Sequence, residues 1–103
     1  MIRHCVLIRA KPGISAADEI ASAFEGLRAL GSRLTGMLAF AGGPDASPEG
    51  LQRGYTHAFT IDFADEAARD GYLVDAEHRA LGARLVAAAE GGREGILVVD
   101  FEG

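Results

Sequence analysis

Three histidines and a tyrosine could carry acid-base chemistry: His4, His57 (in the segment Gly54-Tyr55-Thr56-His57), Tyr72 and His78. An imidazole titrates at about pH 6.5, so a partly buried histidine is a base at neutral pH. A tyrosine hydroxyl can donate a hydrogen bond to a carbonyl oxygen as negative charge develops on it. We therefore predict His78 as a general base, able to remove an acidic proton between two carbonyl groups, and Tyr72 as the donor.

Each of these side chains also has a structural interpretation. His78 could be a core histidine bonded to the backbone, and Tyr72 a boundary aromatic with a hydrated hydroxyl. For His4 and His57 the structural interpretation is preferred. Three imidazoles can also bind zinc, but their spacing here matches no compact ligand motif, and no carboxylate is placed to orient them. We expect neither a metal nor a cofactor.

The elements that would position these residues can be found from hydrophobic periodicity. Residues 2–9 alternate as a strand with His4 on its apolar side, and Ser15 predicts the N-cap of a helix that ends at Gly31. A second strand is predicted at 34–41, followed by a long loop at 42–54 that could act as a lid. The third strand, 55–63, has His57 on its apolar side.

The last third of the chain contains a predicted break between two helices. Asp65 predicts the start of a short helix that runs to about Tyr72, and Asp75 predicts the N-cap of the next. In one continuous helix, residues six apart are rotated by about 240° and point apart. The break therefore lets Tyr72 and His78 converge. A final strand is predicted at 96–101.

This order, β-α-β-β-α-β over one domain of 1–103, predicts an α+β ferredoxin-like fold with an antiparallel sheet and the helices on one face. The first and third strands are then central neighbours, and His4 and His57 should both project toward Tyr72 and His78. We expect a pocket between sheet and helices for a small hydrophobic molecule, lined in addition by apolar side chains. These are Val6, Phe24, Phe59 and Ile61.

Composition narrows the possible partners. A formal net charge of −5 disfavours binding to nucleic acid. No apolar run approaches the roughly 18 residues of a membrane-spanning helix. Cys5 is the only cysteine, so it cannot form an intramolecular disulfide. We expect a cytoplasmic protein without a membrane partner.

Several of these residues match a known family. Met1-Ile2-Arg3-His4 opening a strand, Gly54-Tyr55-Thr56-His57 in the third strand, and the later Tyr72 and His78 resemble the stress-responsive dimeric α/β-barrel (Dabb) family over almost the whole chain. The resemblance implies a homodimer in which two four-stranded sheets close a barrel with the helices outside. The small or polar side chains on the other face of the third strand fit such an interface: Thr56, Ala58, Thr60 and Asp62.

The family includes cofactor-free polyketide cyclases of the olivetolic acid cyclase type. This similarity implies an aldol cyclisation of a polyketide-like substrate with His78 as base and Tyr72 as acid. His4 and His57 would line the pocket or orient the other groups. Many members have His-Pro-x-His where this chain has Asp75-Ala76-Glu77-His78, so only the last histidine is kept. Two other functions stay open: a non-catalytic stress-response dimer that binds a hydrophobic ligand or a protein, and a cofactor-free monooxygenase.

Overall fold

The computed structural model describes residues 1–103 and contains four strands and three α-helices. In chain order they are β1 (Ile2–Ile8), α1 (Ile14–Ala29), β2 (Met37–Pro44), β3 (His57–Phe63), α2 (Glu66–Val74), α3 (Ala76–Ala88) and β4 (Ile96–Glu102). Short 3₁₀ turns, η1 (Leu30–Ser32) and η2 (Gly92–Gly95), follow α1 and α3.

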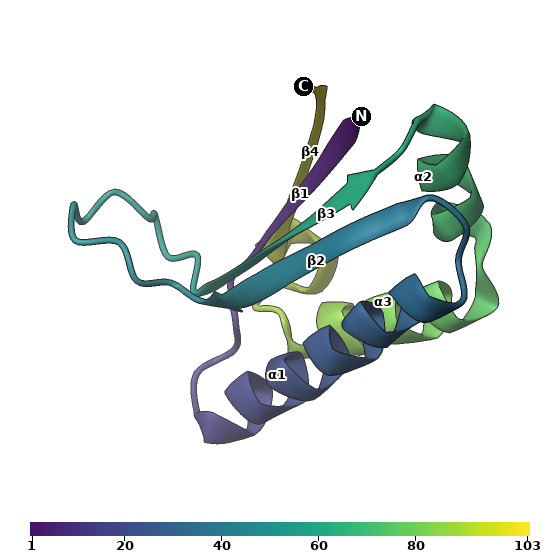
Figure 1. Ribbon diagram of the computed structural model, residues 1–103. Coiled ribbons are helices and arrows are strands. Elements are labelled where there is room, and N and C mark those ends of the chain that lie inside the picture. Colours follow the sequence, from purple (N-terminus) through teal and green to yellow (C-terminus); the bar gives the residue numbers. More distant parts are fainter.

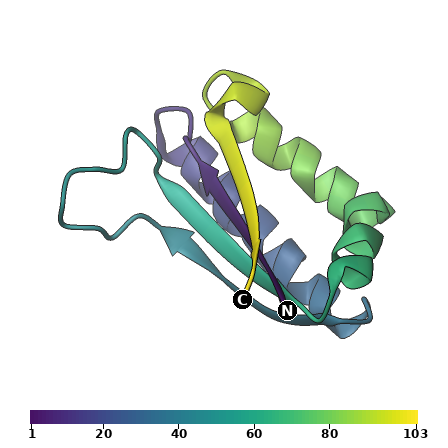
Figure 2. The same cartoon turned by 90° about the horizontal axis from the view of Figure 1, so that it is seen from above.

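The predicted topology is confirmed. The strands form one antiparallel sheet in the order β2-β3-β1-β4, so β1 and β3 are the central pair. All three helices lie on one face of the sheet (Figures 1 and 2). The two chain ends lie side by side at one end of the sheet, where the Gly103 amide donates to the Met1 carbonyl over 3.0 Å (Figure 1).

Some predicted boundaries are wrong, among them the start of β3, which is His57 instead of Tyr55. Helix α1 begins at Ile14 without a side-chain cap, because Gly13 with φ 105° turns the chain directly into it. Strand β2 spans 37–44 instead of 34–41 because the glycines after Ala41 pair with β3 rather than starting the loop. At Gly42 the strands approach closely enough that an added Cβ would lie 2.7 Å from the Phe59 Cβ, so only glycine fits without a shift.

The predicted break between the second and third helices is confirmed. The Asp65 carboxylate caps α2 by accepting from the Ala68 amide at 2.9 Å. Asp75 is the one extended residue between α2 and α3, with φ −66° and ψ 133°, and its carboxylate accepts from the His78 amide at 3.1 Å. Arg33, just after η1, donates two hydrogen bonds to the same carboxylate, at 2.8 and 3.0 Å. The break is therefore tied to the end of α1.

The core lies between the helices and the inner face of the sheet. Alternate β1 residues are buried there, and His4, only 5% exposed, is buried among apolar side chains. The outer face of the sheet is uncovered, and on β4 it presents three large apolar side chains that are 43–52% exposed. These are Leu97, Val99 and Phe101. None of the helices combines the length and apolar character needed to span a membrane.

Candidate functional site

A cavity of about 390 Å³ lies between the β1–β4 side of the sheet and helices α2 and α3. His4, Tyr72 and His78 all line it. Its size falls in the range of small-molecule sites, and most of its wall is apolar. The other lining residues are Val6, Leu27, Phe59, Leu73, Gly82, Leu85, Val86, Arg93, Ile96 and Val98.

The structure brings five of the eight predicted site residues to this cavity: His4, Val6, Phe59, Tyr72 and His78. The other three are His57, Phe24 and Ile61. Ile61 is fully buried in the core, and the Phe24 ring packs edge-on against the rings of Phe59 and His57, at 5.3 and 6.3 Å.

The strand register explains why His57 lies elsewhere. His57 faces the helices as predicted, but it pairs with Ile8, whereas His4 pairs with Ile61. The two histidines are thus four residues apart along the central pair of strands, or about 13 Å. His57 Nδ1 lies 2.8 Å from the Thr56 hydroxyl, which also bonds the backbone of Ile8. Burial lowers the pKa of His57, consistent with a neutral ring that anchors the start of β3.

The rings of Tyr72 and His78 lie in close, tilted contact across the helix break. Their ring centroids are 3.9 Å apart and their planes are inclined by 34°. The Tyr72 hydroxyl and the His78 Nδ1 are both buried without a hydrogen-bond partner. Because Nδ1 is covered while the residue lines the cavity, Nε2 is the His78 nitrogen that can reach a ligand.

The protonation states of this pair follow from its burial. Burial raises the pKa of the Tyr72 hydroxyl far above its ordinary value, so it stays a proton donor. Burial also lowers the pKa of His78, an effect that the nearby backbone carbonyl of Leu73 only partly offsets. At neutral pH the pair is a neutral imidazole beside a protonated phenol, as a base and a donor would need to be.

His4 is held by charged groups that the sequence analysis did not identify. Its Nδ1 lies 2.7 Å from Oδ1 of Asp100, and Arg69 on α2 donates to Oδ2 of the same carboxylate at 2.9 Å. The signal was present in the sequence: Asp100 shares the inward phase of Ile96 and Val98, after a run of four apolar residues. In the structure it is directly paired with His4.

The structure contains no cluster of potential metal ligands. No group of three or more His, Cys, Asp or Glu side chains lies close enough to bind one ion together. His4 and His78 share the cavity, but the third histidine is at the far end of the central strands.

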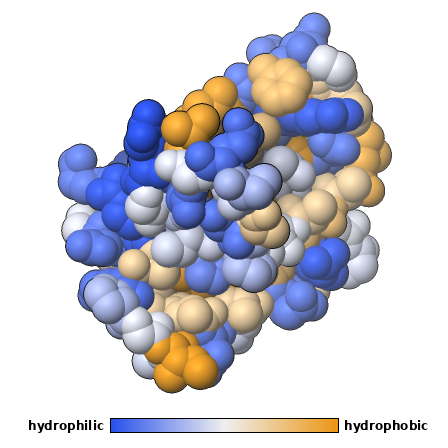
Figure 3. All heavy atoms as spheres, turned by 90° about the vertical axis from the view of Figure 1, so that its left-hand side faces the viewer, coloured by the Kyte–Doolittle hydropathy of each residue, from blue (hydrophilic) through white to orange (hydrophobic).

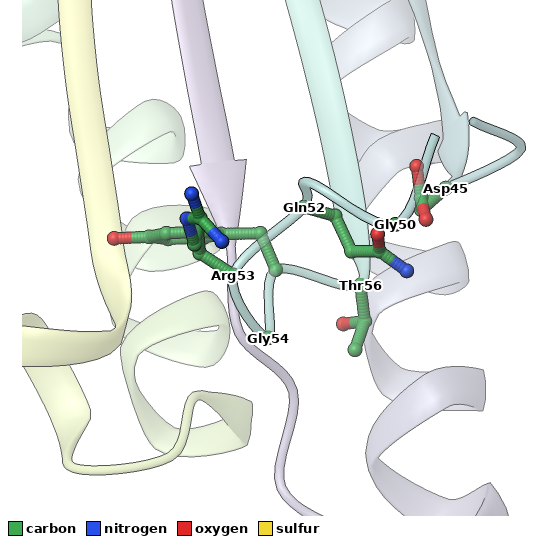
Figure 4. Close-up of a pocket in the computed structure, with 7 residues that line it drawn as sticks. Asp45, Gly50, Gln52, Arg53, Gly54 and Thr56 are labelled. Atoms are coloured by element: carbon green, nitrogen blue, oxygen red, sulfur yellow. The ribbon is translucent and has the colours of Figure 1, made fainter. Parts of the chain in front are cut away.

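A second hollow, of about 570 Å³, lies under the loop between β2 and β3. Figure 4 shows Asp45 and Arg53 on opposite sides of it, with Gln52 between them. The face of the molecule on this side has only scattered apolar patches among polar residues (Figure 3). This hollow is open and polar and contains no paired acid and base, so the cavity of His78 is the stronger candidate for chemistry.

Comparison with known proteins supports the fold. The structure is similar to a dimeric ferredoxin-like protein of unknown function from Jannaschia sp. CCS1, with 35% identity, a TM-score of 0.93, and 99% and 98% of the two chains covered. It also resembles a hydroxynitrile lyase from Passiflora edulis, at 22% identity, a TM-score of 0.78, and coverage of 97% and 90%. At that identity the likeness concerns the fold alone.

Sequence comparison is consistent with this likeness. A curated relative, the stress-response A/B barrel domain-containing protein HS1 of Arabidopsis thaliana, is 29% identical over 101 residues, which cover 98% of this chain and 88% of the relative. The model of the stress responsive A/B barrel domain matches residues 2–103. The chain therefore belongs to the stress responsive A/B barrel domain (Dabb) family.

Proposed function

We propose that the protein is a cofactor-independent acid-base enzyme that acts on a small, largely apolar compound with two carbonyl groups, such as a linear polyketide. The observation that carries this proposal is the close ring pair of Tyr72 and His78 on the cavity wall, in which the buried Tyr72 hydroxyl has no hydrogen-bond partner in the free protein. Buried polar atoms without partners are rare, and a hydroxyl of this kind beside a cavity can be satisfied by a bound ligand.

The proposed reaction is redox-neutral. Nε2 of His78 removes a proton from the carbon between two carbonyls, and the Tyr72 hydroxyl donates a hydrogen bond to the enolate oxygen that forms. The enolate carbon attacks a more distant carbonyl carbon of the same molecule, which forms a carbon–carbon bond and an alkoxide. The imidazolium of His78 then returns the proton to that alkoxide, and both side chains regain their starting states.

The walls of the cavity support a substrate of this kind. Leu27, Phe59, Leu85 and Val98 provide apolar contacts, and the polar side chains of His4, Tyr72, His78 and Arg93 interrupt this apolar wall. A carbon chain can lie against the apolar wall while its carbonyl oxygens meet the donors. The Tyr72 hydroxyl has almost no accessible surface, so a carbonyl reaches it only when neighbouring side chains shift to admit the ligand.

The test is the turnover of a panel of linear β-polyketide thioesters by His78→Ala, with product identified by mass spectrometry. We expect cyclised product from the wild type and none from His78→Ala. The matched control is Arg79→Ala, an exposed neighbour on α3 without an ion pair, which should retain full activity. Full activity of His78→Ala with a folded protein would show that another group is the base.

Measurements of ligand binding and of oxygen consumption separate the other two functions. A ligand that binds without turnover would favour the non-catalytic binding protein. Consumption of oxygen with a phenolic substrate would favour the monooxygenase. Both would use the same cavity, so His4, Tyr72 and His78 are the residues to vary in each case.

We also propose that the protein is a homodimer that pairs through the outer face of the sheet. Leu97, Val99 and Phe101 are about half exposed there, and burial of such a row of side chains is favourable. The Jannaschia protein similar to this chain is described as dimeric. Light scattering should give about twice the chain mass of 10.8 kDa, and Val99→Glu should lower it. A wild-type mass of one chain at micromolar concentration would contradict the proposal.

A further inference from the structure

We infer that Asp100 and Arg69 are positioning residues that hold His4 with its Nδ1 proton directed at Asp100 and its Nε2 lone pair directed at the cavity. His4 would then be a second proton acceptor, opposite Tyr72 and His78. Its catalytic consequence rests on the function proposed above, whereas the tautomer of His4 can be measured without it.

The backbone places this pair. His4 and Asp100 are directly opposite each other in the β1–β4 ladder, and their side chains both face the helices. Directly opposed residues have Cβ atoms about 5 Å apart, which is within reach of one imidazole–carboxylate hydrogen bond. The separation of 2.7 Å between Nδ1 and Oδ1 is that of a charge-assisted bond.

Arg69 fixes the charge of Asp100. Burial alone would raise the pKa of Asp100, but the hydrogen bonds from Arg69 and His4 outweigh it and lower that pKa below its ordinary value. Asp100 is therefore a carboxylate at neutral pH and can only accept hydrogen bonds. The facing Nδ1 must carry a proton, so in the ring that holds a single proton Nε2 is left as the acceptor.

The surroundings of His4 limit its freedom to rotate. Its ring lies between the aromatic rings of Phe59, Phe63 and Tyr72, with centroids 6.1, 6.2 and 5.7 Å away. The charged or titratable groups that face it come from β4, α2 and α3: Asp100, Arg69, Tyr72 and His78. Only Asp100 among them is bonded to the ring.

This arrangement also specifies the ligand. The lone pair of His4 Nε2 lies in an apolar wall, so it favours a ligand with a hydroxyl group that can donate a hydrogen bond to it. An acceptor left without a hydrogen bond in such a site would weaken binding. We therefore expect substrates with an enolic or phenolic hydroxyl in addition to the carbonyl that Tyr72 meets. Arg93, which lines the same cavity from η2 and has no ion-pair partner, is an exposed cation at its rim.

The test is the variant Asp100→Asn. The asparagine oxygen is expected to remain with Arg69, which can only donate, so the amide NH₂ would face His4 Nδ1 and donate to it. The ring would then be forced into the tautomer with its proton on Nε2, which cannot accept from a ligand. Long-range ¹⁵N–¹H NMR of histidine-labelled protein distinguishes the two tautomers directly.

We expect the Nδ1–H tautomer of His4 in the wild type and the Nε2–H tautomer in Asp100→Asn, with kcat reduced roughly 10- to 100-fold and KM changed much less. The matched control is Asp70→Asn. Asp70 is the other carboxylate bonded to Arg69, at 2.9 Å, but it does not contact His4, so neither the tautomer nor kcat should change.

Two results would overturn the inference: an Nε2–H tautomer of His4 in the wild type, or an unchanged tautomer in a folded Asp100→Asn. If turnover survives in His78→Ala while the tautomer of His4 changes as expected in Asp100→Asn, the proposed base is wrong and the role of Asp100 stands. The NMR measurement needs no substrate, so it applies even if the protein proves to be a binding protein.

Discussion

Replacement of Tyr72 by phenylalanine is expected to stabilise the ligand-free protein. The Tyr72 side chain is 1% exposed, and its hydroxyl is buried without a hydrogen-bond partner. A buried polar group left unpaired costs about 1–3 kcal/mol, whereas Tyr72→Phe keeps the ring and its contacts with His4, Phe63 and His78. The free energy of unfolding should therefore rise by about 1 kcal/mol or more.

The assay is thermal unfolding followed by circular dichroism at one fixed protein concentration, since any dimer makes the midpoint concentration-dependent. For a domain of this size, 1 kcal/mol corresponds to a shift in Tm of about 4–8 °C. Tyr55→Phe is the control, because Tyr55 is only partly buried, beside the guanidinium of Arg9. Its effect should stay within about 0.5 kcal/mol.

The stabilised variant should also be the less active one. Tyr72→Phe lacks the donor for the developing enolate, so its kcat should fall while its Tm rises. An unchanged or lower Tm would refute the reasoning, because it would mean that the hydroxyl already has a partner in the free protein. A higher Tm with full turnover would instead remove Tyr72 from the chemistry.

Three further predictions concern pH and packing. Since burial lowers the pKa of His78, the acid-side fall of kcat/KM should have its midpoint below the ordinary histidine pKa of about 6.5, as the free base becomes protonated. Gly42→Ala should destabilise the protein by about 1–3 kcal/mol in urea unfolding because its Cβ meets Phe59, whereas Gly43→Ala, with open space at that position, should not. The hydrogen bonds from Arg33 lower the pKa of Asp75 to about 2. The charge of Asp75 therefore stabilises the fold fully above about pH 4. The difference in free energy of unfolding between the wild type and Asp75→Asn, measured as a function of pH, should disappear as pH falls through about 2.

Much of the fold could be predicted from local patterns. Period-2 alternation identified the inward faces of β1 and β3, and the capping aspartates identified where α2 and α3 begin. The end of β2 could not be found in this way. Gly42-Gly43-Pro44 has the composition of a turn, but pairing with β3 overrides that local preference. A long-range partner decides such a boundary, and a single sequence does not show it.

The candidate site was predictable where it depends only on which face of a strand each side chain occupies. Phase places His4 and His57 on one face, but it does not say how far apart along the strands they lie, and the antiparallel register sends them to opposite ends. The partnership of His4 with Asp100 also depends on register, since β1 and β4 are adjacent only in the folded sheet. The hydrogen bond from Arg69 to Asp100 could not be predicted either, because it depends on how α2 packs against the sheet.

The single extended residue between α2 and α3 has a consequence for the history of this family. Tyr72 and His78 meet only because Asp75 departs from helical geometry. A relative could keep both side chains and lose their contact through one substitution that lets the two helices join. Another could gain the contact by acquiring a capping residue, without any new acid or base. Activity among relatives should therefore follow the residue at the cap more closely than the tyrosine and histidine themselves.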